Sequence, residues 1–409
     1  MAKLIDITGK ALSGEWGIDD ETGDGVPVLR TTNFTNEGVV NYNDVITRTI
    51  TKKNIDQKFL RKGDIIIEKS GGSDKFPVGR VIYFDGDENT YLFNNFTGLL
   101  RVKDKKIWNS KYVFYSLFAN YRRGGTRAFE NKTTGIHNLK TDDFVSRFDI
   151  YELPIKEQNL ICEKLDKIYN IIKLRRQELL ILDDLIKARF VEMFGDPYVN
   201  PLKWKKLKIK DAVIIEPQNG LYKPQSDYVT DGTGIPILRI DGFYDGMVTD
   251  FASLKRLKCS ETERQRYLLL EDDIVINRVN SIEYLGKCAH IKELLEDTVY
   301  ESNMMRMHFD PEYYNPVYIC KLLCSQFIYD QIVNHAKKSV NQASINQIDV
   351  LDFNIYQPPL DLQNEFADFV YQIDKSKSAK AMKEFNCHII YYMLHFIQND
   401  FNKNNLNEM

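Results

Sequence analysis

Residues 153–195 decide the fold, and they read LPIKEQNLICEKLDKIYNIIKLRRQELLILDDLIKARFVEMFG. Pro154 suits the first turn of a helix, where its missing N–H would be unpaired anyway. Gly195 followed by Pro197 is a stop signal, and no Gly or Pro lies between Pro154 and Gly195. The segment therefore predicts one helix of about 41 residues, which at 1.5 Å per residue is roughly 60 Å long.

The apolar residues of this helix form a stripe whose spacing alternates between four and three, with one missed step at Arg175. The stripe consists of Ile161, Leu165, Ile168, Ile172, Leu179, Leu182 and Ile186. This pattern is typical of a coiled-coil seam, which needs a partner helix. The alternative is a long core helix of one large domain, which fits less well because few globular helices are this long.

The composition is that of a globular chain with room for two domains, since 43% of its 409 residues are hydrophobic and 28% are charged. No apolar run approaches the roughly 18 residues of a membrane span, and the N-terminus lacks the apolar core of a signal peptide. We therefore expect a cytoplasmic protein without membrane contact. The net charge of −3 gives no overall case for nucleic-acid binding, so any such case must rest on local patches.

The six cysteines are expected to be reduced, mostly buried thiols. They are Cys162, Cys259, Cys288, Cys320, Cys324 and Cys387. Only Cys320 and Cys324 are close in the sequence, and no His lies beside them at the spacing of a metal ligand. The sequence therefore predicts no metal site.

The second half of the chain repeats the order of motifs in the first half. Residues 26–30 (VPVLR) match residues 235–239 (IPILR), and residues 60–67 match residues 269–276, both at an offset of 209. Four further blocks recur in the same order, and the last of them places Pro359 and Gln363 at an offset of 205 from Pro154 and Gln158. A repeat of this length indicates a duplicated domain of about 155 residues followed by a long helix.

Each repeat mixes short β-like runs with a few helices, so we predict an α+β fold. Two duplicated α/β domains would be separated and joined by two long helices, which form an antiparallel coiled coil with pseudo-twofold symmetry. The predicted segments are a globular domain at 1–153, a central helix at 154–196, a second domain at 197–357, a distal helix at 358–400 and a polar tail at 401–409. Within the domains, strands are expected at 65–68, 80–84 and 274–277, and helices near 110–121 and 316–334.

The distal helix carries a less regular apolar stripe than the central one. Its positions are Phe366, Phe369 and Ile373 and then, after a break at residues 374–380, Phe385, Ile389 and Tyr392. The simplest partner for the central stripe is this second helix.

Motifs for catalysis are missing from the sequence. There is no Gly-rich phosphate loop, and residues 315–318 (NPVY) lack the second proline of an adenine-methylating loop. No His pair has metal-ligand spacing, and no Ser/His/Asp set has a local signature. We therefore expect no catalytic residue and no cofactor in this chain.

Two stretches of the first domain are candidates for contact with DNA. Residues 68–75 (EKSGGSDK) offer small residues, hydroxyls and lysines after a predicted strand, which suit close approach to a phosphate backbone. Residues 122–127 (RRGGTR) place arginines on a Gly-rich loop, which suits phosphate contact or bidentate reading of guanine. The candidates are Lys69, Ser70, Gly71, Gly72, Ser73, Lys75, Arg122, Arg123, Arg127 and Lys132. The alternatives are an ordinary hairpin loop and a solvated helix end.

The corresponding stretches of the second domain carry Asn and Gln, the side chains that read adenine in the major groove. The candidates are Arg278, Asn280, Lys337, Lys338, Asn341 and Gln342. A polar surface loop is the alternative in each case. Residues 203–210 alternate lysines with apolar residues, which favours an edge strand with a charged face over a DNA contact.

These features together resemble the DNA-specificity subunit of type I restriction–modification systems. The resemblance covers essentially the whole chain and is carried by IYELP at 150–154 with Gln158, FGDP at 194–197, GDIIIEKSGGS at 63–73 and GIPILR at 234–239. The second half departs slightly from the first, because PPL at 358–360 replaces LPI at 153–155 and the distal stripe breaks at 374–380. These departures concern the regularity of the pseudo-twofold.

The resemblance implies two target-recognition domains, each reading one half of a bipartite, asymmetric site in double-stranded DNA. It implies that the two helices space these domains and dock two modification subunits, which bind S-adenosylmethionine and methylate adenine N6. A restriction and translocase subunit that uses ATP and Mg would add cleavage. Two other interpretations stay open: a specificity subunit of another modification system with a fused nuclease–methylase partner, and a stand-alone DNA-modifying enzyme.

Overall fold

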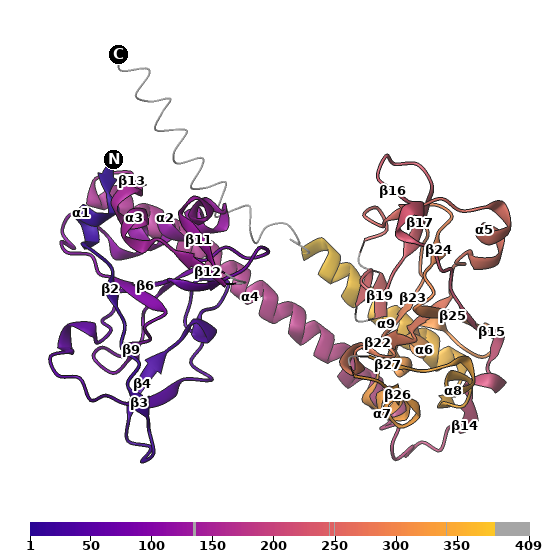
Figure 1. Cartoon of the computed structure of the whole chain (residues 1–409). Helices are drawn as coiled ribbons and strands as arrows, with labels where there is room; N and C mark the ends of the chain where they lie inside the picture. The colour runs from indigo at the N-terminus through magenta and orange to yellow at the C-terminus, as the bar shows by residue number, and fades with distance from the viewer. Residues whose placement is uncertain (134–135, 245, 249, 341, 381–409) are drawn as a thin grey trace. The chain divides into compact units, whose positions relative to one another are not determined.

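The computed structural model describes residues 1–133, 136–244, 246–248, 250–340 and 342–380 (Figure 1). These residues fold as two compact units, 1–175 and 176–380, and the long helix α4 (Ile155–Phe194) continues from the first unit into the second. Among the described residues, no helix is long and apolar enough to span a membrane. The predicted stripe positions Phe385, Ile389 and Tyr392 and the polar tail fall outside the described residues.

The strands of the first unit form four small sheets, in the orders β1–β13, β2–β10–β6–β8, β3–β5–β4–β9 and β11–β12–β7. The strands are β1 (Ala2–Lys3), β2 (Leu12–Ser13), β3 (Ile18–Asp19), β4 (Val26–Leu29), β5 (Ile46–Thr49), β6 (Ile65–Glu68), β7 (Ser70–Gly72), β8 (Val81–Tyr83), β9 (Leu92–Phe93), β10 (Thr97–Leu100), β11 (Glu130–Thr133), β12 (Ile136–Leu139) and β13 (Asp149–Ile150). The helices before α4 are α1 (Leu4–Thr8), α2 (Ser110–Arg122) and α3 (Thr141–Arg147).

The second unit repeats these sheets strand by strand, in the orders β14–β28, β15–β25–β21–β23, β16–β20–β17–β24 and β26–β27–β22, with β19 and β18 extending the second of them. The strands are β14 (Lys205–Lys208), β15 (Val213–Asn219), β16 (Tyr228–Val229), β17 (Ile235–Leu238), β18 (Phe243–Tyr244), β19 (Gly246–Val248), β20 (Arg256–Leu257), β21 (Ile274–Asn277), β22 (Val279–Asn280), β23 (Cys288–His290), β24 (Val299–Tyr300), β25 (Met304–Phe309), β26 (Lys337–Lys338), β27 (Ala343–Ser344) and β28 (Asn354–Gln357). The helices are α5 (Glu261–Tyr267), α6 (Pro316–Leu323), α7 (Gln326–His335), α8 (Gln347–Leu351) and α9 (Leu360–Lys380). Even the direction of pairing recurs, because β4 and β9 run parallel and so do β17 and β24. The predicted duplication is therefore confirmed.

A buried aspartate precedes the central strand of each unit. Asp64 accepts two hydrogen bonds from the Arg101 guanidinium (2.8 and 2.6 Å), and Asp273 accepts one from Arg306 (3.0 Å). Each carboxylate also accepts the backbone N–H three residues before it, at 2.7 and 2.8 Å respectively. Because the charge is paired and hydrogen-bonded, it can be buried beside strands β6 and β21, every residue of which is buried.

A buried glutamine in the first turn of each long helix holds that helix on its domain. The Gln158 amide accepts the N–H of Asn109 (2.8 Å) and donates to the carbonyl oxygens of Ile107 (2.9 Å) and Leu153 (2.8 Å). The side chain is 0% exposed, and Asn109 is itself the N-cap of α2. One amide therefore fixes the start of α4 against the start of α2. It also fixes the short segment that connects β13 to α4.

Gln363 repeats this arrangement at the start of α9. It accepts the N–H of Asn315 (2.9 Å) and donates to the carbonyl oxygens of Tyr313 (2.9 Å) and Pro358 (2.8 Å). Asn315 caps α6 as Asn109 caps α2. The pairing of Gln158 with Gln363 in the sequence thus reflects one structural device used twice.

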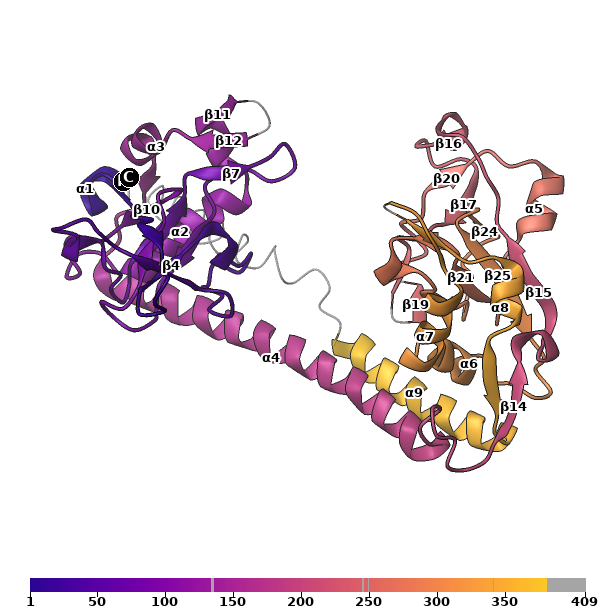
Figure 2. The ribbon, with the colours of Figure 1, turned by 60° about the horizontal axis from the view of Figure 1, so that its bottom comes forward.

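Within the second unit, α9 lies alongside the C-terminal half of α4 and runs in the opposite direction (Figure 2). Phe190 packs edge-on against Phe366, with ring centroids 5.5 Å apart. Two ion pairs flank this contact: Arg189 with Glu365 at 3.0 Å, and Asp183 with Lys377. Since the α4 partner numbers rise as the α9 numbers fall, the predicted antiparallel pairing is present for this part of the helices.

The structure corrects three sequence expectations about helices. The segment predicted as one helix near 316–334 is two helices, α6 and α7, separated at Cys324 and Ser325. Residues 374–380, where the distal stripe breaks, remain helical in α9, and Lys377 of this segment pairs with Asp183 of α4. Ile161 and Leu165 are buried in the core of the first unit, so among the described residues they anchor α4 to its own domain.

We predict that Gln158→Met and Gln363→Met each destabilise the chain. Methionine preserves most of the volume but removes the partner of three backbone groups, and leaving the buried carbonyl among them unsatisfied costs about 1–3 kcal/mol. Equilibrium urea unfolding should show lower midpoints for both variants by similar amounts, because the two sites share one geometry. Lys156→Met, at an exposed position two residues earlier, is the control. If the glutamine variants unfold like this control, the amides do not hold the helices.

Candidate nucleic-acid interface

A three-stranded sheet carries part of the first candidate stretch together with Lys132. β12 pairs with β7 on one side and with β11 on the other, so that Gly72, His137 and Lys132 lie in one row across the sheet (Figure 2). The predicted loop at 68–75 is therefore partly wrong, because residues 70–72 form a strand. Gly72 fits there for a steric reason, since a Cβ would lie 2.5 Å from the backbone nitrogen of Val78.

The tip after β7 is a tight turn that projects two side chains. The Ser73 N–H donates to the Phe76 carbonyl (2.7 Å), and the Phe76 N–H donates to Ser73 Oγ (3.2 Å). Ser73 is thus used to shape the turn. Lys75 and Phe76 are exposed, Phe76 at 59%, and the Lys75 ammonium lies 5.3 Å from the centre of the Phe76 ring. An exposed cation beside an exposed ring suits phosphate contact and base stacking.

The arginines of 122–127 divide into two roles. Arg127 donates to the carbonyl oxygens of Asp74 (3.2 Å) and Lys75 (3.4 Å), so it supports the turn after β7. Arg122 and Arg123 are exposed at the end of α2, where Gly124 adopts φ +75° and stops the helix. The two stretches are thus coupled physically, because one arginine of the second positions the lysine of the first.

Lys69 turns away from the tip of the sheet. Its ammonium donates to Ser13 Oγ (2.9 Å), and partial burial lowers the pKa of Lys69. Its charge is therefore less available to a phosphate than the charge of Lys75. Ser70 and Gly71 are part of strand β7. Lys132 lies on β11, opposite His137 of β12.

Sequence reasoning missed a buried contact between an imidazole and a carboxylate within this sheet. His137 is buried, and its Nδ1 lies 2.9 Å from Glu130 Oε2, while its Nε2 lies 3.5 Å from the exposed Asp74 carboxylate. Glu130 also accepts the N–H of Val78 (3.0 Å). In the duplicated order of motifs, residues 136–139 (IHNL) correspond to residues 344–347 (SINQ), but spacing alone does not place Glu130 beside His137.

The equivalent sheet of the second unit, β26–β27–β22, gathers the remaining candidates. Lys337 and Lys338 are exposed on β26, and the N–H and hydroxyl of Ser339 both donate to the Gln342 carbonyl (2.7 and 2.9 Å), which closes the hairpin. Val340 at the hairpin tip is 99% exposed. Asn341 falls outside the described residues.

Two other candidates of the second unit are engaged within the protein. Arg278 donates to the Ser302 carbonyl (2.9 Å), and Asn280 Oδ1 accepts the N–H of Ser281 (2.8 Å). Arg278 occupies the position equivalent to Lys69, and both side chains turn back onto their own unit. The exposed candidate cations are thus Lys75 at the tip and Arg122 and Arg123 at the end of α2 in the first unit, and Lys337 and Lys338 on β26 in the second.

Comparison with known proteins gives this geometry a context. Residues 2–182 match a family model described as the type I restriction modification DNA specificity domain. The chain is 26% identical over 398 residues to the EcoKI type I restriction enzyme specificity subunit of Escherichia coli K12, covering 90% of this chain and 79% of that protein. It is 24% identical over 388 residues, with the same two coverages, to the StySPI specificity subunit of Salmonella potsdam.

Residues 2–182 thus match the type I DNA specificity domain, and nearly the whole chain is similar to type I specificity subunits. Its fold is also that of solved specificity subunits. The S subunit of M. genitalium superposes with a TM-score of 0.54 at 15% identity, covering 96% of this chain and 94% of that one. A chain from a structure of a type I system that addresses complex assembly and conformational transition gives a TM-score of 0.53 at 14% identity and covers 96% of both chains.

We predict that Lys75→Ala and Arg123→Ala weaken DNA binding by this chain and reduce its salt dependence. Each lost phosphate contact should lower the slope of log K against log salt by about 0.9. Titration of a DNA duplex at several salt concentrations measures this slope. Lys106→Ala is the matched control, because Lys106 is exposed before the start of α2 and Arg123 follows its end, roughly 20 Å away. A slope unchanged in both variants would remove this sheet from the interface.

Proposed function

We propose that this chain is the sequence-reading subunit of a type I restriction–modification complex, with each globular unit reading one half of a bipartite, asymmetric site in double-stranded DNA. The observation that carries the proposal is the duplication, because every sheet of the first unit has a counterpart in the second with the same strand order. The two three-stranded sheets are the proposed reading surfaces. They share a backbone arrangement but carry different side chains, which is what two different half-sites require.

We propose that catalysis resides in partner chains. Two modification subunits would bind S-adenosylmethionine and methylate adenine N6, and restriction and translocase subunits would use ATP and Mg. The family match and the names of the relatives support a complex of this kind, and a cytoplasmic location follows from its DNA substrate. A partner in which nuclease and methylase are fused is the second candidate, and sequencing the genes next to this one separates the two.

We propose that the partner chains dock on the long helices, where they contact apolar side chains that remain exposed in this chain. Ile161, Leu165, Ile186 and Phe366 of the predicted docking stripes are buried in the cores of the units, so they hold the helices in place. Ile168, Ile172, Leu179, Leu182, Phe369 and Ile373 are half-buried. Along α4, Ile171, Leu174, Ile181 and Leu185 are exposed. At 100° per residue these four fall within roughly 80° of one another, so they form a second apolar stripe.

We predict that recognition is modular. Exchanging residues 203–357 for the equivalent segment of a relative should change one half-site and leave the other intact. These limits keep the β14–β28 pair whole, since Lys205–Lys208 and Asn354–Gln357 move together. Methylome sequencing of cells that express the hybrid with its partner subunits reads both half-sites directly. A simultaneous change in both halves would contradict the modular proposal.

We also predict that the length of α4 sets the gap between the half-sites. Four residues inserted after Arg175 lengthen the helix by roughly 6 Å and turn the downstream part by about 40°, so the spacer should grow by about one or two base pairs. Residues 173–177 are all exposed, so an insertion there disturbs no core contact. Two inserted residues turn the downstream part by about 200° and should abolish methylation.

Methylome sequencing distinguishes the outcomes of these insertions. A four-residue variant that remains active with the original spacer would show that something other than the helix sets the gap. The sequences of the two half-sites should be the same for the four-residue variant as for the original chain, because neither globular unit is altered. They serve as the internal control.

A further inference from the structure

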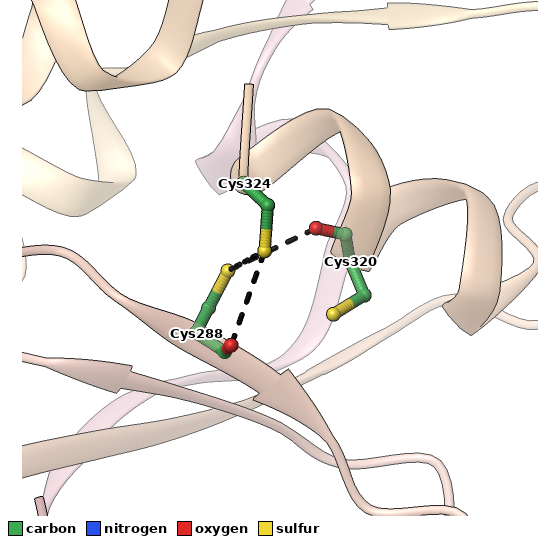
Figure 3. Close-up of side chains that lie close together, drawn as sticks. All are labelled: Cys288, Cys320 and Cys324. Atoms are coloured by element: carbon green, nitrogen blue, oxygen red, sulfur yellow. Dashed lines mark hydrogen bonds between the residues drawn. The ribbon is translucent and has the colours of Figure 1, made fainter. Parts of the chain in front are cut away.

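Three cysteines of the second unit meet where its largest sheet packs against helix α6 (Figure 3). Cys288 begins β23, Cys320 lies in α6, and Cys324 is the residue at which α6 ends. Their Sγ atoms all lie within 4.8 Å of one another, and Cys288 and Cys324 are separated by 3.3 Å between sulfurs. The sequence shows only the one-turn spacing of Cys320 and Cys324, because β23 brings Cys288 from 32 residues earlier.

The spacing of the three sulfurs matches the demands of one thiolate-bound ion. Zinc binds thiolate at about 2.3 Å, so sulfurs that share one tetrahedral zinc ion lie roughly 3.8 Å apart. The closest two sulfurs lie 3.3 Å apart and all three lie within 4.8 Å of one another, a range that includes this value. Cys288 and Cys320 are buried, whereas Cys324 is exposed, so the cluster is fixed on its inner side and open on its outer side.

Gly246 and Lys321 complete the surroundings of the cluster. Gly246 adopts φ +86°, and a Cβ there would lie 3.2 Å from Cys320 Sγ and 3.7 Å from Cys324 Sγ, so glycine keeps this side clear. The same point lies 3.5 Å from Lys321 Nζ, which places an ammonium group close to the sulfurs. A neighbouring cation favours the thiolate form that metals require.

We propose that Cys288, Cys320 and Cys324 form a binding site for a soft divalent cation, with Zn²⁺ as the representative ion and water as the fourth ligand. Binding replaces three S–H bonds by three metal–sulfur bonds, and the three protons pass to solvent. The occupied site carries one net negative charge, which Lys321 offsets. A cavity of about 660 Å³ lined by Cys324, Lys321 and Asp183 supplies the water and the route by which the ion enters.

The site ties the six-stranded sheet of the second unit to helix α6. Cys288 and Cys320 belong to the same hydrophobic core as Phe190 of α4 and Phe366 of α9. An ion that bridges β23 and α6 therefore stabilises the join between the sheet and the helix pair in the second unit. The first unit carries no equivalent, because the cysteines have no counterparts at the matching positions of its sequence.

Cobalt(II) titration of the full, reduced, metal-free chain tests the proposal. We expect one Co²⁺ per chain, with a sulfur-to-cobalt charge-transfer band and intense visible bands of a tetrahedral thiolate site, and loss of these bands when Zn²⁺ is added. Cys324→Ser and Cys288→Ser should lose them, whereas Cys259→Ser, which alters a partly exposed thiol outside the cluster, should retain them. Far-UV circular dichroism of Cys324→Ser checks that its fold is retained, which we expect because Cys324 ends α6 and lies outside the hydrophobic core. Absence of the bands in the unaltered chain, or their persistence in Cys324→Ser, would overturn the proposal.

A second measurement does not depend on any variant. Zn²⁺ should protect Cys324 from alkylation by N-ethylmaleimide while leaving Cys259 as reactive as before, which mass spectrometry of the digested chain resolves site by site. The thermal unfolding midpoint should also rise with free Zn²⁺, because an ion that binds only the folded chain stabilises it by mass action. Equal labelling of Cys324 with and without Zn²⁺ would contradict the site.

Discussion

The structure depends on a buried carboxamide at the start of each long helix. Gln158 and Gln363 are each fully buried. Each side chain accepts one hydrogen bond from a backbone N–H and donates two to backbone carbonyl oxygens. An amide at this point holds together three things: the first turn of the helix, the cap of a shorter helix and the segment that leaves the sheet. Because hydrogen bonds are directional, each glutamine fixes the angle at which the long helix leaves its own domain. Apolar packing alone constrains this angle less.

Much of this arrangement was predictable because its determinants are local or repeated. The continuous apolar run of β6, the missing Gly and Pro in α4, and the fixed offset between Gln158 and Gln363 are all visible in the sequence. The directions of long side chains were not. Lys69 and Arg278 bond to groups 56 and 24 residues away, and such partners are set by the completed fold rather than by neighbouring residues. The thiol cluster was not predicted for the same reason, since Cys288 is distant in sequence from Cys320 and Cys324.

The apolar pattern of α4 shows that periodicity alone does not identify the element that packs against a helix face. A stripe that alternates in steps of four and three identifies a face, but not the element that covers it. At one end that face packs on the first core through Leu165, and at the other it packs on α9 through Phe190. A single helix thus changes its partner along its length while keeping one periodicity. The exposed middle of α4 is the part whose sequence is least constrained by the chain's own packing.

The pairing of β1 with β13 and of β14 with β28 has a consequence for how such chains change over time. In each unit the first and last strands are neighbours, so the polypeptide enters and leaves the domain at one place. Domains with adjacent ends tolerate circular permutation and insertion, because new connections need only be short. Each globular unit therefore behaves as a cassette on the helical frame, and recombination between genes can replace a whole cassette without altering the frame that carries it.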